Sequence, residues 1–79
     1  MAEIVMPALG ADMEDAILLQ WRIAPGSEVH RTESVAYIET DKGAIEIECY
    51  VDGIVEELLV TPGDRVPVGA PIARVRPPG

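Results

Sequence analysis

An internal repeat limits the folds open to this chain more than any other feature of its 79 residues. Residues 16–38 align with residues 53–75 without a gap, at an offset of 37 positions. The matched positions include apolar sites and a shared Pro-Gly step: Ile17 with Ile54, Pro25-Gly26 with Pro62-Gly63, Val29 with Val66, and Ala36 with Ala73. Three or more copies would indicate a solenoid, so two copies predict a closed structure whose halves are related by a pseudo-twofold axis.

Each copy of the repeat has the pattern of β-strands joined by turns. Residues 17–23 alternate between two sets of side chains, which predicts a strand: Ile17, Leu19, Trp21 and Ile23 against Leu18, Gln20 and Arg22. A Pro-Gly turn follows in each copy, and a later strand ends at Ile38 or Val75. Residues 3–6 predict one more strand, and no window has a capped helical pattern. This spacing is typical of an all-β sandwich or barrel.

The connection between the two copies predicts a hairpin with one lysine at its turn. Two strand-like runs, 35–38 and 44–51, flank an apex of Asp41, Lys42 and Gly43. In the second run, apolar residues alternate with acidic residues and a tyrosine, so one face should be buried and the other wet. By the pseudo-symmetry, Lys42 should lie at the end of the molecule opposite the two chain termini. From local sequence alone, an ordinary solvated lysine and a lysine acylated by a separate enzyme both remain open.

Composition and charge exclude several classes of function. Fourteen acidic residues against six basic ones give a net charge of −8. That balance argues against nucleic acid and against an anionic membrane surface as partners. It suits partners with basic patches. With no Phe and only three other aromatic residues, the chain should have an aliphatic core.

Few residues of the chain could form an active site. Cys49 is the single cysteine and should be a small buried hydrophobe in its strand. His30 is the only histidine, which is too little for a histidine metal site or a catalytic triad. The acidic loop around Asp12 lacks the spacing of a calcium-binding loop. A Schiff-base lysine needs a lowered pKa from burial or a cationic neighbour, whereas carboxylates flank Lys42 in the sequence.

The lysine segment resembles that of a known family. Glu39-Thr40-Asp41-Lys42-Gly43, with residues 44–48 after it, is similar to the lipoylation segment of lipoyl domains, which belong to the acyltransferase components of 2-oxo acid dehydrogenase complexes. Other segments match the same pattern: residues 5–10, 51–55, 62–66 and 69–73. The likeness covers residues 2–76, with two departures. Gly43 replaces the commoner Ala, which should loosen the turn, and Ala16 stands where Gly often occurs.

The resemblance implies a fold and a site. The fold would be a flattened β-barrel or sandwich of two four-stranded antiparallel sheets with internal pseudo-twofold symmetry. A lipoate ligase or lipoyl transferase would attach lipoate to Lys42 by an amide bond. The loop after the first strand would lie near the hairpin. The residues expected to contact partner enzymes are Glu39, Thr40, Asp41, Gly43, Leu9, Gly10 and Asp12.

The resemblance also implies a function as a swinging-arm carrier. The arm would accept an acyl group from a thiamine-dependent 2-oxo acid dehydrogenase component and carry it to an acyltransferase core. Dihydrolipoamide dehydrogenase, a flavoprotein, would then reoxidise it. The domain would catalyse no step itself, and in isolation it should be a monomer.

Two other readings stay open beside the lipoyl carrier. A biotinyl carrier shares the fold, but that family flanks its lysine with methionines, whereas Asp41 and Gly43 stand here. An unmodified binding module would leave Lys42 as a solvated turn residue. Residues 1–76 are expected to form the carrier domain and 77–79 to begin a Pro-rich linker. The expected location is a bacterial cytoplasm, with the mitochondrial matrix as the alternative.

Overall fold

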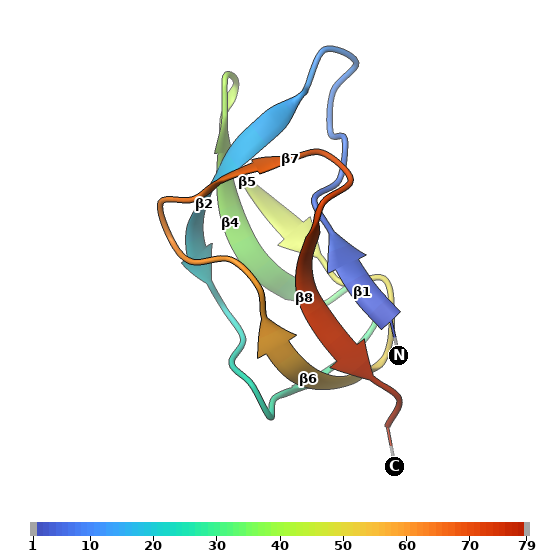
Figure 1. The fold of residues 1–79 in the computed structure, drawn as a ribbon. Coiled ribbons are helices and arrows are strands. Elements are labelled where there is room, and N and C mark those ends of the chain that lie inside the picture. The colour runs from blue at the N-terminus through green and yellow to red at the C-terminus, as the bar shows by residue number, and fades with distance from the viewer. Residues whose placement is uncertain (1, 79) are drawn as a thin grey trace.

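The chain folds into two antiparallel four-stranded sheets that face each other (Figure 1). We describe residues 2–78 of a computed structural model. One sheet has the order β1 (Ala2–Val5), β8 (Pro71–Arg76), β6 (Gly53–Leu58), β3 (Glu28–Val29). The other has the order β5 (Gly43–Glu48), β4 (Ser34–Thr40), β2 (Asp15–Trp21), β7 (Arg65–Pro67). The predicted all-β sandwich is confirmed. The described part of the chain has no helix that could cross a membrane.

The two sheets are equivalent under the predicted pseudo-twofold axis. Strands β1 to β4 correspond in sequence order to β5 to β8, and this exchange converts one sheet order into the other. Each sheet therefore combines strands from both copies of the repeat. Neither half can bury its apolar face alone, so the two copies must fold as one unit.

The core between the sheets is aliphatic, as the composition predicts. Its large, fully buried side chains come from both halves: Ile4, Met6, Leu18, Val29, Val35, Ile38, Val55, Ile72 and Val75. Cys49 is also buried, and its thiol donates to the carbonyl of Val51 at 2.9 Å. Both positions that the sequence marks as turn glycines have positive φ, 91° at Gly26 and 98° at Gly63. These turns thus need the conformational freedom of glycine.

One detail of the sequence interpretation is wrong. The alternation through residues 17–23 would place Leu19 on the same face as Ile17, with Leu18 on the other. In the structure Leu19 is 40% exposed, whereas Trp21 and Ile23, which the alternation places on its face, pack against the core. The register of β2 against β4 shifts between Leu18 and Gln20, so Leu19 lies in a β-bulge. A bulge inserts one residue and reverses the alternation beyond it.

The lysine hairpin and the chain ends lie at opposite ends of an elongated body, as predicted (Figure 1). The molecule measures 38 × 22 × 17 Å along its principal axes. The turn between β4 and β5 stands at the top of Figure 1, whereas β1 begins and β8 ends near the bottom. The predicted domain and linker also include Met1 and Gly79, which lie outside the described residues.

Candidate functional site

A tight turn at the tip of the β4–β5 hairpin presents Lys42. Thr40 pairs with Gly43, so Asp41 and Lys42 alone form the turn, which confirms the predicted strand–turn–strand. The Thr40 hydroxyl fixes the turn from inside. It accepts a hydrogen bond from the Lys42 amide at 3.1 Å and donates one to the Gly43 carbonyl at 3.1 Å. These bonds hold the backbone at Lys42 while its side chain remains free to extend.

Gly43 has a backbone conformation that other residues rarely adopt. Its φ is 107°, and a Cβ placed there would meet no atom within 4 Å. A side chain would therefore fit in the space here, and only the positive φ disfavours residues other than glycine. The sequence comparison suggested that glycine in place of alanine loosens this turn. In this geometry glycine instead removes backbone strain that an alanine would introduce.

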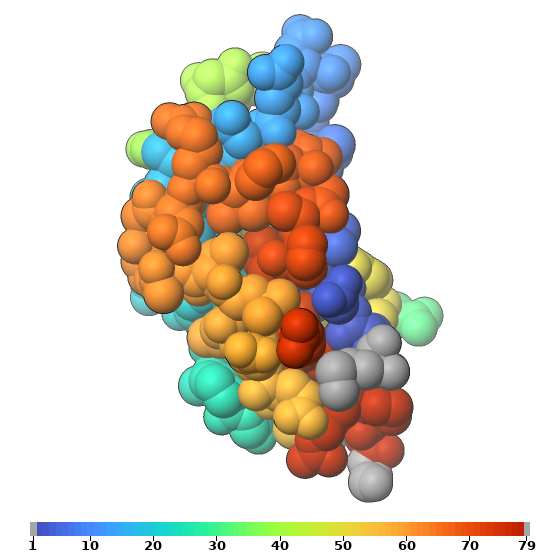
Figure 2. All heavy atoms as spheres, in the orientation of Figure 1, coloured from blue at the N-terminus to red at the C-terminus, as the bar shows by residue number. Residues whose placement is uncertain are grey.

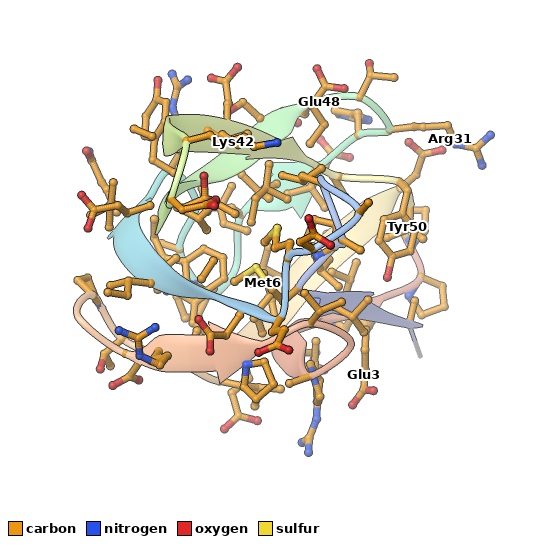
Figure 3. All side chains as sticks on the ribbon, turned by 90° about the horizontal axis from the view of Figure 1, so that it is seen from above. Glu3, Met6, Arg31, Lys42, Glu48 and Tyr50 are labelled. Carbon is orange, nitrogen blue, oxygen red and sulfur yellow. The ribbon has the colours of Figure 1, made fainter. Side chains whose placement is uncertain are left out.

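The amine of Lys42 is available for chemistry. Its side chain is exposed, and within residues 2–78 it forms no ion pair, although four arginines do. Viewed along the long axis in Figure 3, Lys42 crosses the tip of the hairpin with its nitrogen toward the loop between β1 and β2. An unpaired, exposed amine on a fixed backbone can enter the active site of another enzyme without disturbing the core.

The loop between β1 and β2, residues 6–14, stands beside the hairpin. Figure 2 shows this loop and the hairpin tip together at one end of the surface. Its predicted contact residues Leu9, Gly10 and Asp12 line a hollow that Thr40, Asp41 and Lys42 also line. The predicted proximity of loop and hairpin is confirmed. The roles of these residues, and of Glu39 and Gly43, in partner recognition stay predictions.

An acidic groove of about 360 Å³ runs beside the hairpin. It is lined by five carboxylates, from Asp12, Glu14, Asp15, Glu39 and Asp41. Its one cation, Arg65 of β7, pairs with Asp15 at 2.8 Å and neutralises part of this charge. Glu39 lines this groove but does not line the smaller hollow next to Lys42. No group of three or more potential ligands within residues 2–78 is arranged to hold a metal ion.

A polar cluster braces the outer face of the hairpin. Arg22 donates to Glu46 at 3.1 Å and to the Tyr37 hydroxyl at 3.2 Å, with its guanidinium 5.5 Å from the Tyr37 ring centre. Hydrogen bonding from Ser34, then from Tyr37, and the charge of Arg22 lower the pKa of Glu46, against a smaller rise from burial. The cluster thus connects the residue that follows β2 with both strands of the hairpin, β4 and β5.

Sequence reasoning missed three residues of this end of the molecule. Met13 and Ile45 form apolar walls of the hollow at Lys42, and Arg65 comes from the second copy of the repeat. Ile45 was assigned to the buried face of its strand, which is half correct because it is partly exposed. Met13 belongs to the loop that was expected near the hairpin, but for Arg65 the sequence gives no signal, since only the folded chain brings it there.

Known proteins match this chain along nearly its whole length. The sequence model of a family described as "Biotin-requiring enzyme" matches residues 2–75. Component 5 of the chloroplastic dihydrolipoyllysine-residue acetyltransferase of the pyruvate dehydrogenase complex, from Arabidopsis thaliana, is 35% identical over 71 residues. The beta subunit of the pyruvate dehydrogenase E1 component of Rhizobium meliloti is 40% identical over 72 residues. Each alignment covers 90% of this chain, but only 15% and 16% of the relative.

A solved structure matches over the full domain. It is the solution structure of the lipoyl domain of the 2-oxoglutarate dehydrogenase complex from Azotobacter vinelandii. The two chains superpose with a TM-score of 0.76 at 30% identity, and the match covers 98% of each. The neighbour is thus a free-standing domain of the same size and fold.

Proposed function

Since this chain belongs to the biotinyl and lipoyl carrier-domain family, as a lipoyl domain, we propose that Lys42 carries amide-linked lipoate for a 2-oxo acid dehydrogenase complex. The observation that carries the proposal is the unpaired amine of Lys42 on a turn fixed by Thr40, at the end of the body remote from both chain ends. A covalent carrier needs this combination of a fixed backbone and a free nucleophile.

The residues at the site fit an acylated lysine. The Lys42 side chain is exposed at the edge of a small hollow, so an attached chain has room to extend from its amine. In the attachment step, the lysine nitrogen forms a bond to the lipoyl carboxyl carbon, the activating group leaves with the bonding electrons, and the amine loses its proton to the modifying enzyme. We propose that the modifying enzyme also supplies the base that accepts this proton.

Once bound, lipoate supplies a disulfide ring that accepts an acyl group as a thioester. The chain's own contribution is mechanical and electrostatic. The paired β4 and β5 strands hold the attachment point, and the groove of carboxylates offers basic partner surfaces a complementary face. Tethering keeps the carried group at high effective concentration, so it does not diffuse free between active sites.

The proposed partners follow from this role. They are a lipoate ligase or lipoyl transferase, a thiamine-dependent dehydrogenase component, an acyltransferase core and dihydrolipoamide dehydrogenase. We place the domain in an acyltransferase chain, as a monomeric, non-catalytic unit in a bacterial cytoplasm or mitochondrial matrix. The relatives support a role in such a complex, but they do not identify the kind of chain that contains this domain. One relative is an acetyltransferase component and another is an E1 beta subunit.

Intact mass spectrometry of protein from its native host tests the attachment. We expect the mass to increase by one lipoyl group, located on Lys42 by peptide mapping. Lys42→Ala should abolish the addition and leave the free energy of unfolding within about 0.5 kcal/mol, because the side chain is exposed. An added biotin would favour the biotinyl carrier, and no addition would favour an unmodified binding module.

A further inference from the structure

A small apolar hollow lies directly against the attachment lysine. Its volume is about 60 Å³, and Lys42 itself forms part of its wall. Three apolar side chains line it: Leu9 and Met13 from the β1–β2 loop, and Ile45 from β5. We call these three residues the apolar seat. Leu9 is 47% exposed, so this part of the hollow is open to solvent.

The apolar seat is formed before any ligand arrives. The Leu9 amide donates to the Met13 sulfur at 3.4 Å, and the Met13 amide donates to the Gly10 carbonyl at 3.2 Å. Met13 and Ile45 also pack on the hydrophobic core from outside. Because these contacts fix the seat, a group that docks there needs little further ordering of the protein.

Charge around the apolar seat distinguishes a free lysine from an acylated one. Asp12 and Asp41 lie on its rim, where they attract an ammonium group and have no preference for a neutral chain. Acylation removes the ammonium charge and adds a long apolar chain to the same nitrogen. The nearest exposed apolar surface for that chain is then the seat, since Lys42 already borders it.

We propose that the lipoyl arm folds back onto the apolar seat of Leu9, Met13 and Ile45 between visits to partner enzymes, an inference that rests on the proposed attachment at Lys42. Docking involves no covalent step. The hollow has the volume of roughly two water molecules. It can therefore cover only part of the arm, so docking is partial and reversible. Its consequence is that the disulfide ring is less accessible to small reagents than a fully solvated arm would be.

Methyl NMR on the holo-domain tests the docking. Three forms are compared: unmodified, acetylated at Lys42 and lipoylated at Lys42, each verified by intact mass. Acetylation removes the charge without adding the chain, so it corrects for the loss of the ammonium group. We expect lipoylation, but not acetylation, to shift the methyl signals of Leu9, Met13 and Ile45 and to give cross-relaxation between them and the ring protons. Equal spectra for the acetyl and lipoyl forms would overturn the proposal.

A matched pair of variants provides a second readout. Leu9→Ser removes the exposed part of the seat, whereas Leu19→Ser changes a leucine of similar exposure, 40%, on β2 outside the hollow. The rate at which a water-soluble phosphine reduces the ring should rise about threefold in Leu9→Ser and stay unchanged in Leu19→Ser. Unchanged rates in both variants, with unperturbed core methyl signals, would contradict the docking.

The two proposals fail in distinguishable ways. A native protein whose mass lacks a lipoyl group refutes the proposed function and the docking with it. A lipoylated protein whose seat methyl signals match those of the acetylated form refutes the docking alone.

Discussion

The two halves of the molecule repeat each other down to individual hydrogen bonds, yet they differ completely at the lysine end. Backbone bonds that cross between the halves occur in matched pairs, among them Gly26 N to Val55 O at 2.7 Å with Gly63 N to Leu18 O at 2.8 Å, and Val55 N to Ser27 O at 2.8 Å with Leu18 N to Asp64 O at 2.9 Å. The bulge at Leu19 also has its counterpart at Glu56, where β6 shifts register against β8.

The lysine end is where the duplication stops. The turn between β4 and β5 has no twin, since the equivalent place between β8 and β1 is occupied by the chain ends. The β1–β2 connection, residues 6–14, is longer than its counterpart at 49–52. The duplicated part supplies the scaffold, and the candidate site is built from the parts that were not duplicated. The following substitutions test how strictly the halves correspond.

The largest effect is expected at Gly53, whose counterpart in the first half is Ala16. A Cβ at Gly53 would collide with the carbonyl oxygen of Arg76 and with the side chain of Val75. Gly53→Ala should therefore lower the free energy of unfolding by about 2–3 kcal/mol, measured by urea denaturation. Ala16→Gly, the reverse change in the other half, should cost only about 1 kcal/mol. Equal costs would mean that β8 does not crowd β6 as described.

The paired Pro-Gly turns should respond alike. Gly26 and Gly63 both have positive φ, and a Cβ at either would meet nothing within 4 Å. Gly26→Ala and Gly63→Ala should each cost about 1–2 kcal/mol from backbone strain alone. If denaturation showed clearly unequal losses of unfolding free energy in the two variants, the two turns would not be equivalent.

Thr32 and Gly69 are matched positions at which the first half is strained. Thr32 has a positive φ of 74°. Its counterpart Gly69 has a φ of 91°, which a glycine adopts without strain. Thr32→Gly should raise the free energy of unfolding by about 0.5–1 kcal/mol, because relief of strain exceeds the added entropy of the unfolded chain. Gly69→Thr should lower it by a similar or larger amount. A destabilised Thr32→Gly would show that threonine makes a compensating contact.

The smallest effect concerns Glu46, on strand β5 of the hairpin that joins the two halves. Its pKa is lowered in the folded state from an ordinary value of 4.5, so its ionised form stabilises the fold above that pH. The contribution disappears as pH falls through the lower folded-state pKa. Glu46→Gln should therefore be slightly less stable than the unsubstituted protein at pH 7, with the difference vanishing in acid. A difference that persists in acid would rule out ionisation as its source.

The sequence predicted the symmetric part of the molecule better than the asymmetric part. The repeat predicted the two equivalent halves, and the turn residues around Lys42 predicted the hairpin. The bulge at Leu19 was not predictable, because it depends on how β2 pairs with β4. The strain at Thr32 has no local signature either. Leu9 and its loop were expected near the hairpin, but the apolar contact surface that Met13 and Ile45 add shows only in the folded chain.

Lys42 and the ends of the described chain lie at opposite ends of a body that is 38 Å long. If Lys42 carries the proposed lipoyl arm, the rigid body acts as a spacer between that arm and the ends of the domain at Ala2 and Pro78. Pivoting of the whole domain about its attachment would then sweep the lysine through a wider arc than the flexible arm covers alone.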